Sequence, residues 1–379
     1  MRVLALTSYP EQAAATRYRL VQFVAPLAEH GIELIVRPFL EPQTFADLYK
    51  REAALQNALG LLKAATRRVR DLIEAVNVDL ILIQREAMMF GPPVIEWTMT
   101  KVLRRPLVLD LDDATYVRYV SPTYGRIASA LKWFSKTDDL IAWSSLVICG
   151  NRHIADYVSS KGKPKIIIPT VVDLEKFRPR SRSKRVDDKI VVGWIGTHST
   201  FPYLESIFPV LGELARCYKF RLKVIGSGRA KIEIPGVEVE NCEWALEREV
   251  EDLQSFDVGL YPIVNDAWAV GKSGFKAIQY MSVGVPYVVS PVGACAEIGE
   301  PGVTHLCATT GKQWYDALAR LITDEELRRR MGEAGRAHAE KHYALPDQVA
   351  KLAHALRWAS RQKNSVAGEA GEFLSEDKT

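Results

Sequence analysis

Apolar runs rich in β-branched residues alternate with helical patterns along almost the whole chain. Strands separated by helices form βαβ units, so the pattern predicts an α/β fold built on parallel sheets. The stretch TRYRLVQFVAPLAEH (16–30) is typical of the predicted helices, because Leu20, Phe23, Val24 and Leu27 stand at i, i+3, i+4 and i+7. The predicted strands of the first half are VLALT (3–7), LIVRP (34–38), DLILIQ (79–84), LVLDL (107–111), LVICG (146–150) and KIIIP (165–169).

The alternation stops at FRPRSRSKRVDD (177–188), which is charged and aperiodic and therefore predicts a linker between domains. Beyond it we expect a helix over 203–218. The predicted strands there are KIVVGWIG (189–196), FRLKVIG (220–226), VEVE (237–240), DVGLY (257–261) and PYVVS (286–290). The chain is thus predicted to form two doubly wound, Rossmann-like domains, 1–176 and 189–343, that bind ligands outside the carboxyl ends of their strands.

Two segments follow the second domain. ALPDQVAKLAHALRWASR (344–361) has the apolar spacing of a final amphipathic helix. QKNSVAGEAGEFLSEDKT (362–379) has no such pattern, and we expect it to be disordered.

The amino-acid composition is typical of a soluble globular enzyme. The 379 residues are 47% hydrophobic and 25% charged, as in a soluble globular enzyme, and no apolar run reaches the length of a membrane span. The beginning MRVLALTSYP predicts a buried strand rather than a signal peptide. The five cysteines are widely spaced without a C-x-x-C, so we expect neither disulfides nor a zinc site, which fits a cytoplasmic protein. The net charge of +4, without a basic tract interleaved with aromatics, argues against nucleic acid as a partner.

The stretch GKSGFKAIQYMSVGVPYVVS (271–290) carries the main candidate chemistry. A glycine loop that opens a helix favours phosphate, because unpaired N–H groups and the helix dipole both attract anions. In a helix begun near Lys272, the side chains of Lys272, Lys276 and Gln279 share one face, which is either a ligand face or a solvated one. A P-loop is disfavoured, because Asp266 stands where its first glycine should be.

Charged residues also follow the strands of the first half. LDLDDA (109–114) ends a buried strand with three acids, which a core does not tolerate unless they face a cleft or bond to backbone N–H groups. The alternative is that Asp110 or Asp113 caps the next segment. Other charged residues near strand ends, which are either ligand-binding or structural salt bridges, are Arg17, Arg19, Arg85 and Glu86.

The segment QYMSVGVPYVVS with PVGACAEI resembles the donor-site motif of the retaining GT-B glycosyltransferases of family 4, or group 1, which continues as EAMA-x-G-x-PVVA. Further stations resemble this family in the right order: SYP with RYR (8–10, 17–19), IQREA (83–87), LDLDDA (109–114), IPTVVDLEKFRP (168–179), VVGWIGTHST (191–200), FDVGLYP (256–262) and DEELRRRMGEAGRAHAEKHYAL (324–345). The resemblance covers nearly the whole chain. It implies two Rossmann-like domains that face each other across a cleft, with a last helix that crosses back to the first domain. The implied reaction is transfer of a sugar from a nucleotide sugar, with retention at the anomeric carbon and without an obligatory metal or other cofactor.

The resemblance also implies roles for particular residues. The catalytic set is Asp112, which aligns with a histidine that many members place beside the reacting sugar, with Lys276 and His198. The donor-binding set is Gly196, Thr197, Trp244, Gly271, Lys272, Ser273, Gly274, Gln279 and Glu297. The acceptor side would comprise Arg17, Arg19, Arg85 and Glu86. Gly271 and Gln279 stand where the family has glutamates, and the usual Arg and Lys pair is absent from GTHSTFPYLES (196–206).

The expected partners are a UDP- or GDP-linked sugar and an acceptor that is a glycan, a lipid-linked molecule or a small molecule. The alternatives are a degenerate scaffold that has lost catalysis, and a sugar-nucleotide epimerase of the same fold. The helix LGLLKAATRRVRDLIEAV (59–76) carries four cations that predict either peripheral contact with an anionic membrane or a solvated basic face: Lys63, Arg67, Arg68 and Arg70.

Overall fold

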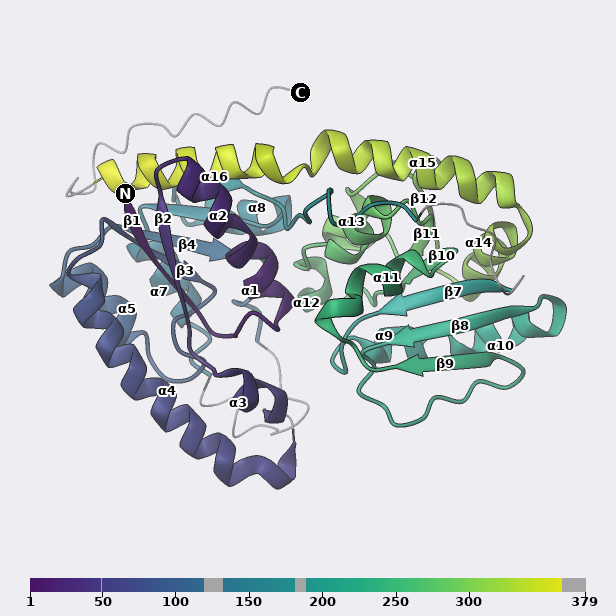
Figure 1. Ribbon diagram of the computed structural model, residues 1–379, viewed down its shortest axis with the longest axis horizontal. Helices are drawn as coiled ribbons and strands as arrows, with labels where there is room; N and C mark the ends of the chain where they lie inside the picture. The colour runs from purple at the N-terminus through teal and green to yellow at the C-terminus, as the bar shows by residue number, and fades with distance from the viewer. Residues whose placement is uncertain (49, 119–131, 181–188, 363–379) are drawn as a thin grey trace. The chain divides into compact units, whose positions relative to one another are not determined.

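The computed structural model describes residues 1–48, 50–118, 132–180 and 189–362. The chain divides into two compact units (Figure 1): unit 1 contains Met1–Thr170 and the residues from Pro346 on, and unit 2 contains Val171–Leu345. Of the predicted linker, residues 181–188 lie outside the described residues, as do residues 363–379 of the predicted disordered tail.

Unit 1 is built on a six-stranded sheet in the order β2-β1-β3-β4-β5-β6. All neighbouring strands run parallel, and Val3 of β1 stands between Leu34 of β2 and Leu80 of β3. The strands are β1 (Arg2–Thr7), β2 (Glu33–Pro38), β3 (Leu80–Gln84), β4 (Leu107–Leu111), β5 (Leu146–Cys149) and β6 (Lys165–Ile167). Every residue of β3, β4 and β5 is buried, which is why these strands read as continuous apolar runs rather than alternating ones.

The helices of unit 1 differ from the sequence expectation at one place. The predicted helix 16–30 is broken into α1 (Ala14–Arg19), η1 (Val21–Phe23) and α2 (Val24–Glu29), because Pro26 has no N–H group and its ring is tolerated only in a first turn. The others are α3 (Pro42–Asp47), η2 (Arg51–Ala53), α4 (Ala54–Ala75), α5 (Val94–Trp97), η3 (Thr98–Val102), α7 (Lys136–Trp143), α8 (Arg152–Ser160) and α16 (Leu345–Arg361). α16 belongs to unit 1 except for its first residue, and its Arg357 donates to the carbonyl of His30 at the end of α2 (Figure 1).

Unit 2 is built on a second parallel sheet of six strands, in the order β12-β11-β10-β7-β8-β9. Its strands are β7 (Ile190–Ile195), β8 (Phe220–Ile225), β9 (Glu238–Cys242), β10 (Val258–Tyr261), β11 (Tyr287–Val289) and β12 (His305–Cys307). β12 is absent from the predicted strands, because three residues are too few to show a period. The two sheets confirm the predicted fold class.

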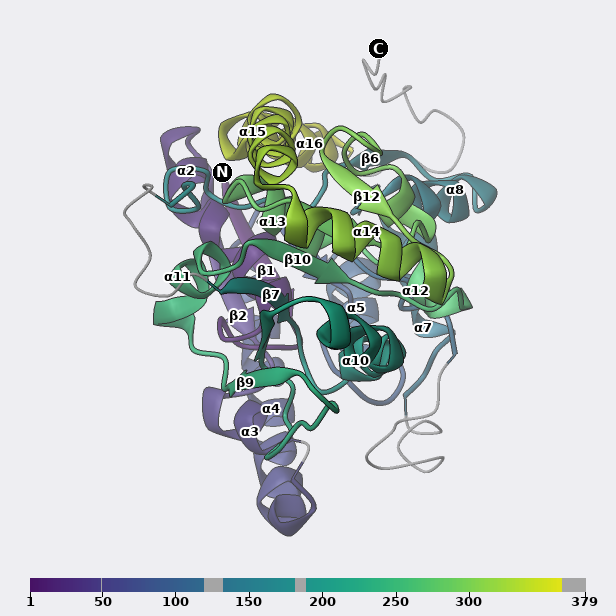
Figure 2. The same cartoon turned by 90° about the vertical axis from the view of Figure 1, so that its right-hand side faces the viewer.

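The helices of unit 2 are α9 (Phe201–Glu205), α10 (Phe208–Cys217), η4 (Leu246–Arg248), α11 (Glu249–Gln254), α12 (Ala267–Val270), α13 (Phe275–Ser282), η5 (Gly293–Ala296), α14 (Gly311–Thr323) and α15 (Glu325–His342). The predicted helix 203–218 is two helices, because Pro209 restarts the helix in the first turn of α10. α10 and α14 pack together and form one apolar cluster with the sheet, while α13 packs against α15 (Figure 2).

A buried histidine in β12 makes the stability of unit 2 depend on pH. His305 is fully buried, stacks on Tyr287 at 4.9 Å and has its Nδ1 atom 2.9 Å from the Thr304 hydroxyl. Burial, and secondarily the charge of His338, lower the pKa of His305 from 6.5 to about 4. Since the unfolded chain takes up this proton first, the stabilisation is complete above about pH 6.5 and is lost as the pH falls toward 4.

We therefore expect His305→Asn to remove part of the acid sensitivity. Between pH 7 and pH 4.5 the free energy of unfolding of the wild type should fall by about 2 to 3 kcal/mol more than that of the variant. Urea unfolding at the two pH values measures the difference. The exposed His153, replaced in the same way, is the matched control and should leave the pH dependence unchanged.

Candidate active site

The carboxyl ends of β7 and β10 form the topological switch point of unit 2. From β7 the chain first adds β8 and β9 on one side, then returns to add β10, β11 and β12 on the other. Loops that leave the sheet in opposite directions open a crevice at such a point, and ligands of doubly wound sheets bind there. The residues at this edge are therefore the first candidates for a site.

Lys276 is held at this edge by aromatic rings. Its Nζ atom lies 5.2 Å from the ring centroid of Tyr261, the last residue of β10, and 5.9 Å from that of Trp194 in β7. Gly196 lies against the same indole, because a Cβ atom added to it would come within 2.3 Å of the Trp194 ring. The aromatic faces attract the ammonium group and fix it where the two strands end.

The loop before Lys276 differs from the predicted helix. α12 ends at Val270, Gly271 follows as its C-cap, and α13 begins only at Phe275, so Lys272 lies in the connecting loop and not in the helix. Gly274 precedes α13 with a φ of 66°, and a Cβ atom there would lie 2.1 Å from Ile298 Cδ1. A left-handed residue packed this closely has to be glycine, and it forces the helix to start after it.

The charges of Lys272 and Lys276 both affect the thiol of Cys295. Burial raises the pKa of the Cys295 thiol to about 11, and a hydrogen bond with Tyr261 and the two ammonium groups partly oppose that rise. Ser273 lies between them in sequence and is half-buried. Two cations and the amino end of α13 thus create a region of positive potential suited to a phosphate group.

Gln279 is buried rather than displayed on the lysine face. Its side-chain amide donates to the carboxylate of Glu249, the first residue of α11, at 3.3 Å. Glu249 is itself buried, so a carboxylate stands beside the position where the sequence lacks a glutamate. Glu249 is not among the predicted site residues, because 30 residues separate it from Gln279 and no local pattern joins them.

The loop after β7 meets the loops after β8 and β9. The N–H group of Gly196 donates to Ile225 at 3.0 Å, and a Cβ atom on Gly226 would lie 3.3 Å from the Cβ of Trp244. A Cβ on Gly228 would likewise lie 2.9 Å from the Cβ of His198. The structure therefore brings Gly196, His198 and Trp244 together.

His198 and its neighbours are exposed. Partial burial and the charge of Arg229 lower the pKa of His198 below 6.5, so its imidazole is neutral at pH 7. The hydroxyl of Thr197 lies 2.8 Å from that of Ser199. Glu297 is exposed after η5, and its charge adds to the burial that raises the pKa of Tyr343 to about 12.

In unit 1 the candidate residues after β3 and β4 form ion pairs. Arg85 binds both oxygens of Asp112, at 2.6 and 2.7 Å, and also Asp113 at 2.7 Å. Burial alone would raise the pKa of Asp112, but the Arg85 charge outweighs it and lowers the pKa, so the carboxylate is ionised. Arg85 has a φ of 62°, a left-handed conformation that is costly for a residue with a side chain.

Arg19 belongs to the interior of unit 1. Its guanidinium binds both oxygens of Asp110 and the carbonyl of Ile168, with both side chains almost fully buried. The interpretation of Asp110 as a cap for the next segment is therefore wrong, because this carboxylate neutralises a buried arginine. Arg17 is also buried, and it bonds to the carbonyls of Glu11 and Gln12 at 2.9 and 3.2 Å.

Glu86 completes the charged edge of unit 1. It lies 3.0 Å from Lys136 and 3.8 Å from Lys132, and its backbone carbonyl accepts from Ser8 at 3.1 Å. These contacts tie the loop after β3 to the loop after β1. All four predicted acceptor-side residues thus have structural partners.

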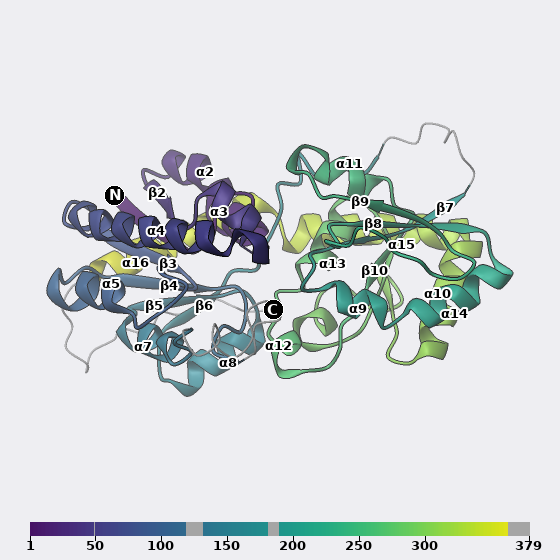
Figure 3. The same ribbon diagram turned by 90° about the horizontal axis from the view of Figure 1, so that it is seen from below.

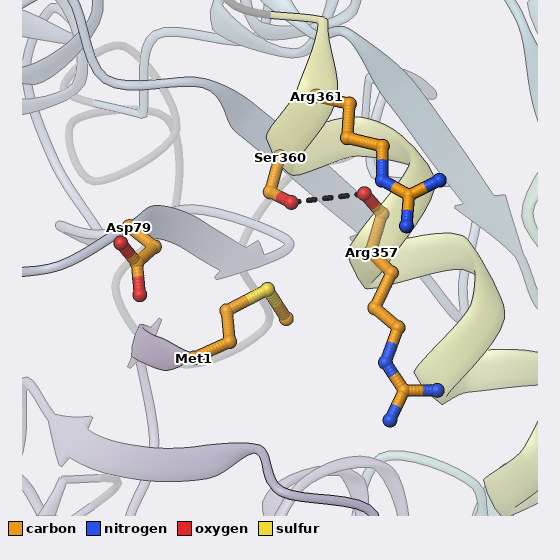
Figure 4. Close-up of a pocket in the computed structure, with 5 residues that line it drawn as sticks. All are labelled: Met1, Asp79, Arg357, Ser360 and Arg361. Atoms are coloured by element: carbon orange, nitrogen blue, oxygen red, sulfur yellow. Dashed lines mark hydrogen bonds between the residues drawn. The ribbon is translucent and has the colours of Figure 1, made fainter.

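A cavity of about 320 Å³ lies away from these residues, at the amino end of the first sheet. It is lined by Met1, Asp79, Arg357, Ser360 and Arg361 (Figure 4). Within residues 1–48, 50–118, 132–180 and 189–362, no group of three His, Cys, Asp or Glu side chains could hold a metal ion. No described helix is long and apolar enough to cross a membrane.

The comparisons with known proteins fit this arrangement. Residues 190–324 match the family model of the glycosyl transferases group 1. The second unit is a group 1 glycosyltransferase domain. This match makes the protein a transferase and confirms the predicted group 1 family for residues 190–324. No curated protein sequence matches the chain.

Solved structures show the same fold over almost the whole enzyme. Sucrose-phosphate synthase from Thermosynechococcus elongatus matches 94% of this chain and 98% of its own, with a TM-score of 0.68 at 14% identity. HepE of Anabaena in complex with UDP-glucose matches 94% and 99%, with a TM-score of 0.68 at 16% identity. A glycosyltransferase from Rickettsia africae matches 95% and 99%, with a TM-score of 0.67 at 10% identity. The chain therefore has the GT-B fold.

Proposed function

We propose that the enzyme moves a sugar from a nucleotide-diphosphate sugar to a glycan, a lipid-linked molecule or a small molecule, with retention and without a metal. One observation carries the proposal: within the group 1 domain, Lys276 is held by Trp194 and Tyr261 at the strand ends. Proteins that match this fold include one bound to UDP-glucose, which supports a uridine donor, with a guanosine donor as the alternative.

The leaving group explains why cations are needed. Breaking the bond between sugar and diphosphate develops negative charge on the phosphate oxygens, and preorganised positive charge lowers that barrier. Lys276, Lys272 and the amino end of α13 supply such charge without a metal ion. Gly271, Ser273 and Gly274 shape the loop so that the diphosphate can approach the backbone closely.

The rest of the donor would be bound by the neighbouring loops. Trp244 offers a flat apolar surface for the base, and Gln279 with Glu249 offers hydrogen-bonding groups for the ribose hydroxyls. Gly196 and Thr197 would lie along the phosphates, and Glu297 would bind hydroxyl groups of the sugar. Neutral His198 can accept a proton or a hydrogen bond near the same loops.

On the acceptor side, Asp112 is the proposed reactive group. Arg85 keeps its carboxylate ionised and oriented, so it can stabilise positive charge at the anomeric carbon or orient an acceptor hydroxyl. Glu86, Arg17 and Arg19 act as positioning residues, because their contacts hold the loops around Asp112. We also propose a cytoplasmic location with peripheral contact to the inner face of a membrane.

Nucleotide binding tests this function directly. In calorimetry on the full chain, we expect one of UDP, GDP and ADP to bind equally well in EDTA and in magnesium. Trp244→Ala should weaken that binding by about tenfold, because a stacked base contributes roughly 1 to 3 kcal/mol. Trp133→Ala, at an exposed tryptophan of unit 1, is the matched control.

Three outcomes would contradict the proposal. Binding that requires magnesium would remove the metal-independent mechanism, and absence of binding would favour a scaffold. Incubation with the donor that yields an isomer instead of a transferred sugar would indicate an epimerase. NMR of the product's anomeric configuration decides between retention and inversion.

A further inference from the structure

Exposed apolar side chains gather on one side of unit 1. Among the described residues, twelve large hydrophobic side chains are exposed, and nine of them lie on α4, α5 and η3 or at the end of α4. These nine, named here the α4 face, are Leu55, Leu59, Leu62, Val69, Ile73, Val76, Val94, Trp97 and Val102. α4 lies on the outside of unit 1 with α5 beside it (Figure 3), and Arg105, just after η3, donates to the carbonyl of Val76.

The side chains on α4 form a continuous stripe. Leu55, Leu59 and Leu62 are spaced by four and three residues, and Val69, Ile73 and Val76 repeat that spacing. Residues so spaced lie on one face of a helix. Leu55 is 76% exposed and Ile73 71%, so this apolar face points to solvent along its whole length.

The opposite face of α4 is polar and buried, which fixes the orientation of the helix. Arg68 donates to the carbonyls of Thr7, Arg37 and Ala87 at 2.7 to 3.0 Å and pairs with Asp71 at 2.7 Å. Turning the stripe inward would leave this buried guanidinium without partners, at a large cost. The expectation that Arg68 lies on the surface is therefore wrong.

The exposed side of α4 also carries cations beside the stripe, one of which lies close to the carboxylate of Glu41. The charged residues that are exposed on this helix are Lys63 and Arg70, while Asp71 is buried and Glu74 is half-buried and paired with Arg37. Arg67 is engaged by Glu41 and the carbonyl of Phe39, and Lys63 lies 3.4 Å from Glu41. Lys101 and Arg104, at the end of η3, are also exposed.

We propose that the α4 face docks on an anionic lipid bilayer. The apolar side chains would enter the boundary between headgroups and acyl chains, Trp97 would lie at the interface, and Lys63 and Arg70 would reach the lipid phosphates. A second copy of the chain is the poorer occupant, because a paired stripe would bring these cations together without an exposed acid of α4 to neutralise them. The apolar surface also includes Val94, Trp97 and Val102, so it is wider than the contact surface that two paired α4 helices would bury.

This inference deepens the membrane contact of the proposed function, but its test is independent of sugar transfer. Full-length protein is sedimented with vesicles of phosphatidylcholine alone and with vesicles containing 30 mol% phosphatidylglycerol. We expect the wild type to bind to the anionic vesicles. Binding of Leu59→Asp/Ile73→Asp should be at least tenfold weaker, because each change would place a charged carboxylate in the lipid. Lys63→Glu/Arg70→Glu should weaken it by about fivefold or more for each site. Val303→Asp, at an exposed apolar position of unit 2, should bind like the wild type.

Nucleotide calorimetry on each variant checks that it is folded and separates this proposal from the function of unit 2. Absence of binding to anionic vesicles would overturn the inference, and so would binding that the α4 variants leave unchanged. A dimer in sedimentation that becomes monomeric in Leu59→Asp/Ile73→Asp would overturn it in favour of a second copy.

Discussion

Replacing Lys276 with alanine is expected to lower kcat for sugar transfer by about two to three orders of magnitude, the usual effect of removing one group that stabilises developing charge. The ammonium group lies between Tyr261 and Trp194 at the switch point of the group 1 domain. Lys272 lies in the preceding loop, with its Nζ atom 5.9 Å from the ring centroid of Trp268. Initial rates at saturating donor measure the change.

The controls separate charge from shape. Lys276→Met keeps most of the aliphatic stem and should be as inactive as the alanine variant, because the positive charge is what stabilises the leaving group. Lys312→Ala removes a lysine that pairs with Asp316 on the exposed side of α14, and it should keep full activity. Equal rates for Lys276→Met and the wild type would remove Lys276 from the mechanism.

The second large effect concerns the stability of unit 1. Asp110→Ala should lower the free energy of unfolding by about 3 to 5 kcal/mol, because it leaves the buried Arg19 charge uncompensated. Burial raises the pKa of Asp110, and the charge of Arg19 opposes that rise. Each charge of the pair therefore stabilises the ionised form of the other. Urea unfolding followed by circular dichroism measures the loss.

A double substitution tests the physical reason. Arg19→Met/Asp110→Leu removes both charges and should cost less than Asp110→Ala alone. Arg37→Met breaks the exposed pair with Glu74 and should cost less than about 1 kcal/mol. A double variant that is less stable than the single one would show that the pair contributes net stability, contrary to this account.

Local patterns predicted the elements well where the pattern was long. The continuous apolar runs at 79–84 and 107–111 became β3 and β4, and the breaks at Pro26 and Pro209 follow a rule that can be read from the sequence. The start of α13 was harder to predict. Gly274 has a left-handed backbone and leaves no room for a Cβ atom beside Ile298, and that contact joins residues 24 positions apart.

The candidate site was predicted in part. The lysines and glycines of 271–276 do gather at the edge of the second sheet, because one short segment carries them. The partners that give them their chemistry come from other elements: Trp194 and Tyr261 for Lys276, and Glu249 for Gln279. Sequence periodicity cannot predict such pairs, because the order of the strands in the sheet places the partners side by side.

The sequence by itself determined the two parallel α/β units, the family and the segment that carries the lysines, because these depend on local periodicity and contiguous motifs. Only the tertiary structure decided which charges are buried and which surface is apolar. Arg68 and Arg70 are two residues apart on the same helix, yet one is buried with four partners and the other faces solvent. Burial and desolvation depend on what packs against a residue, and packing partners come from distant parts of the chain.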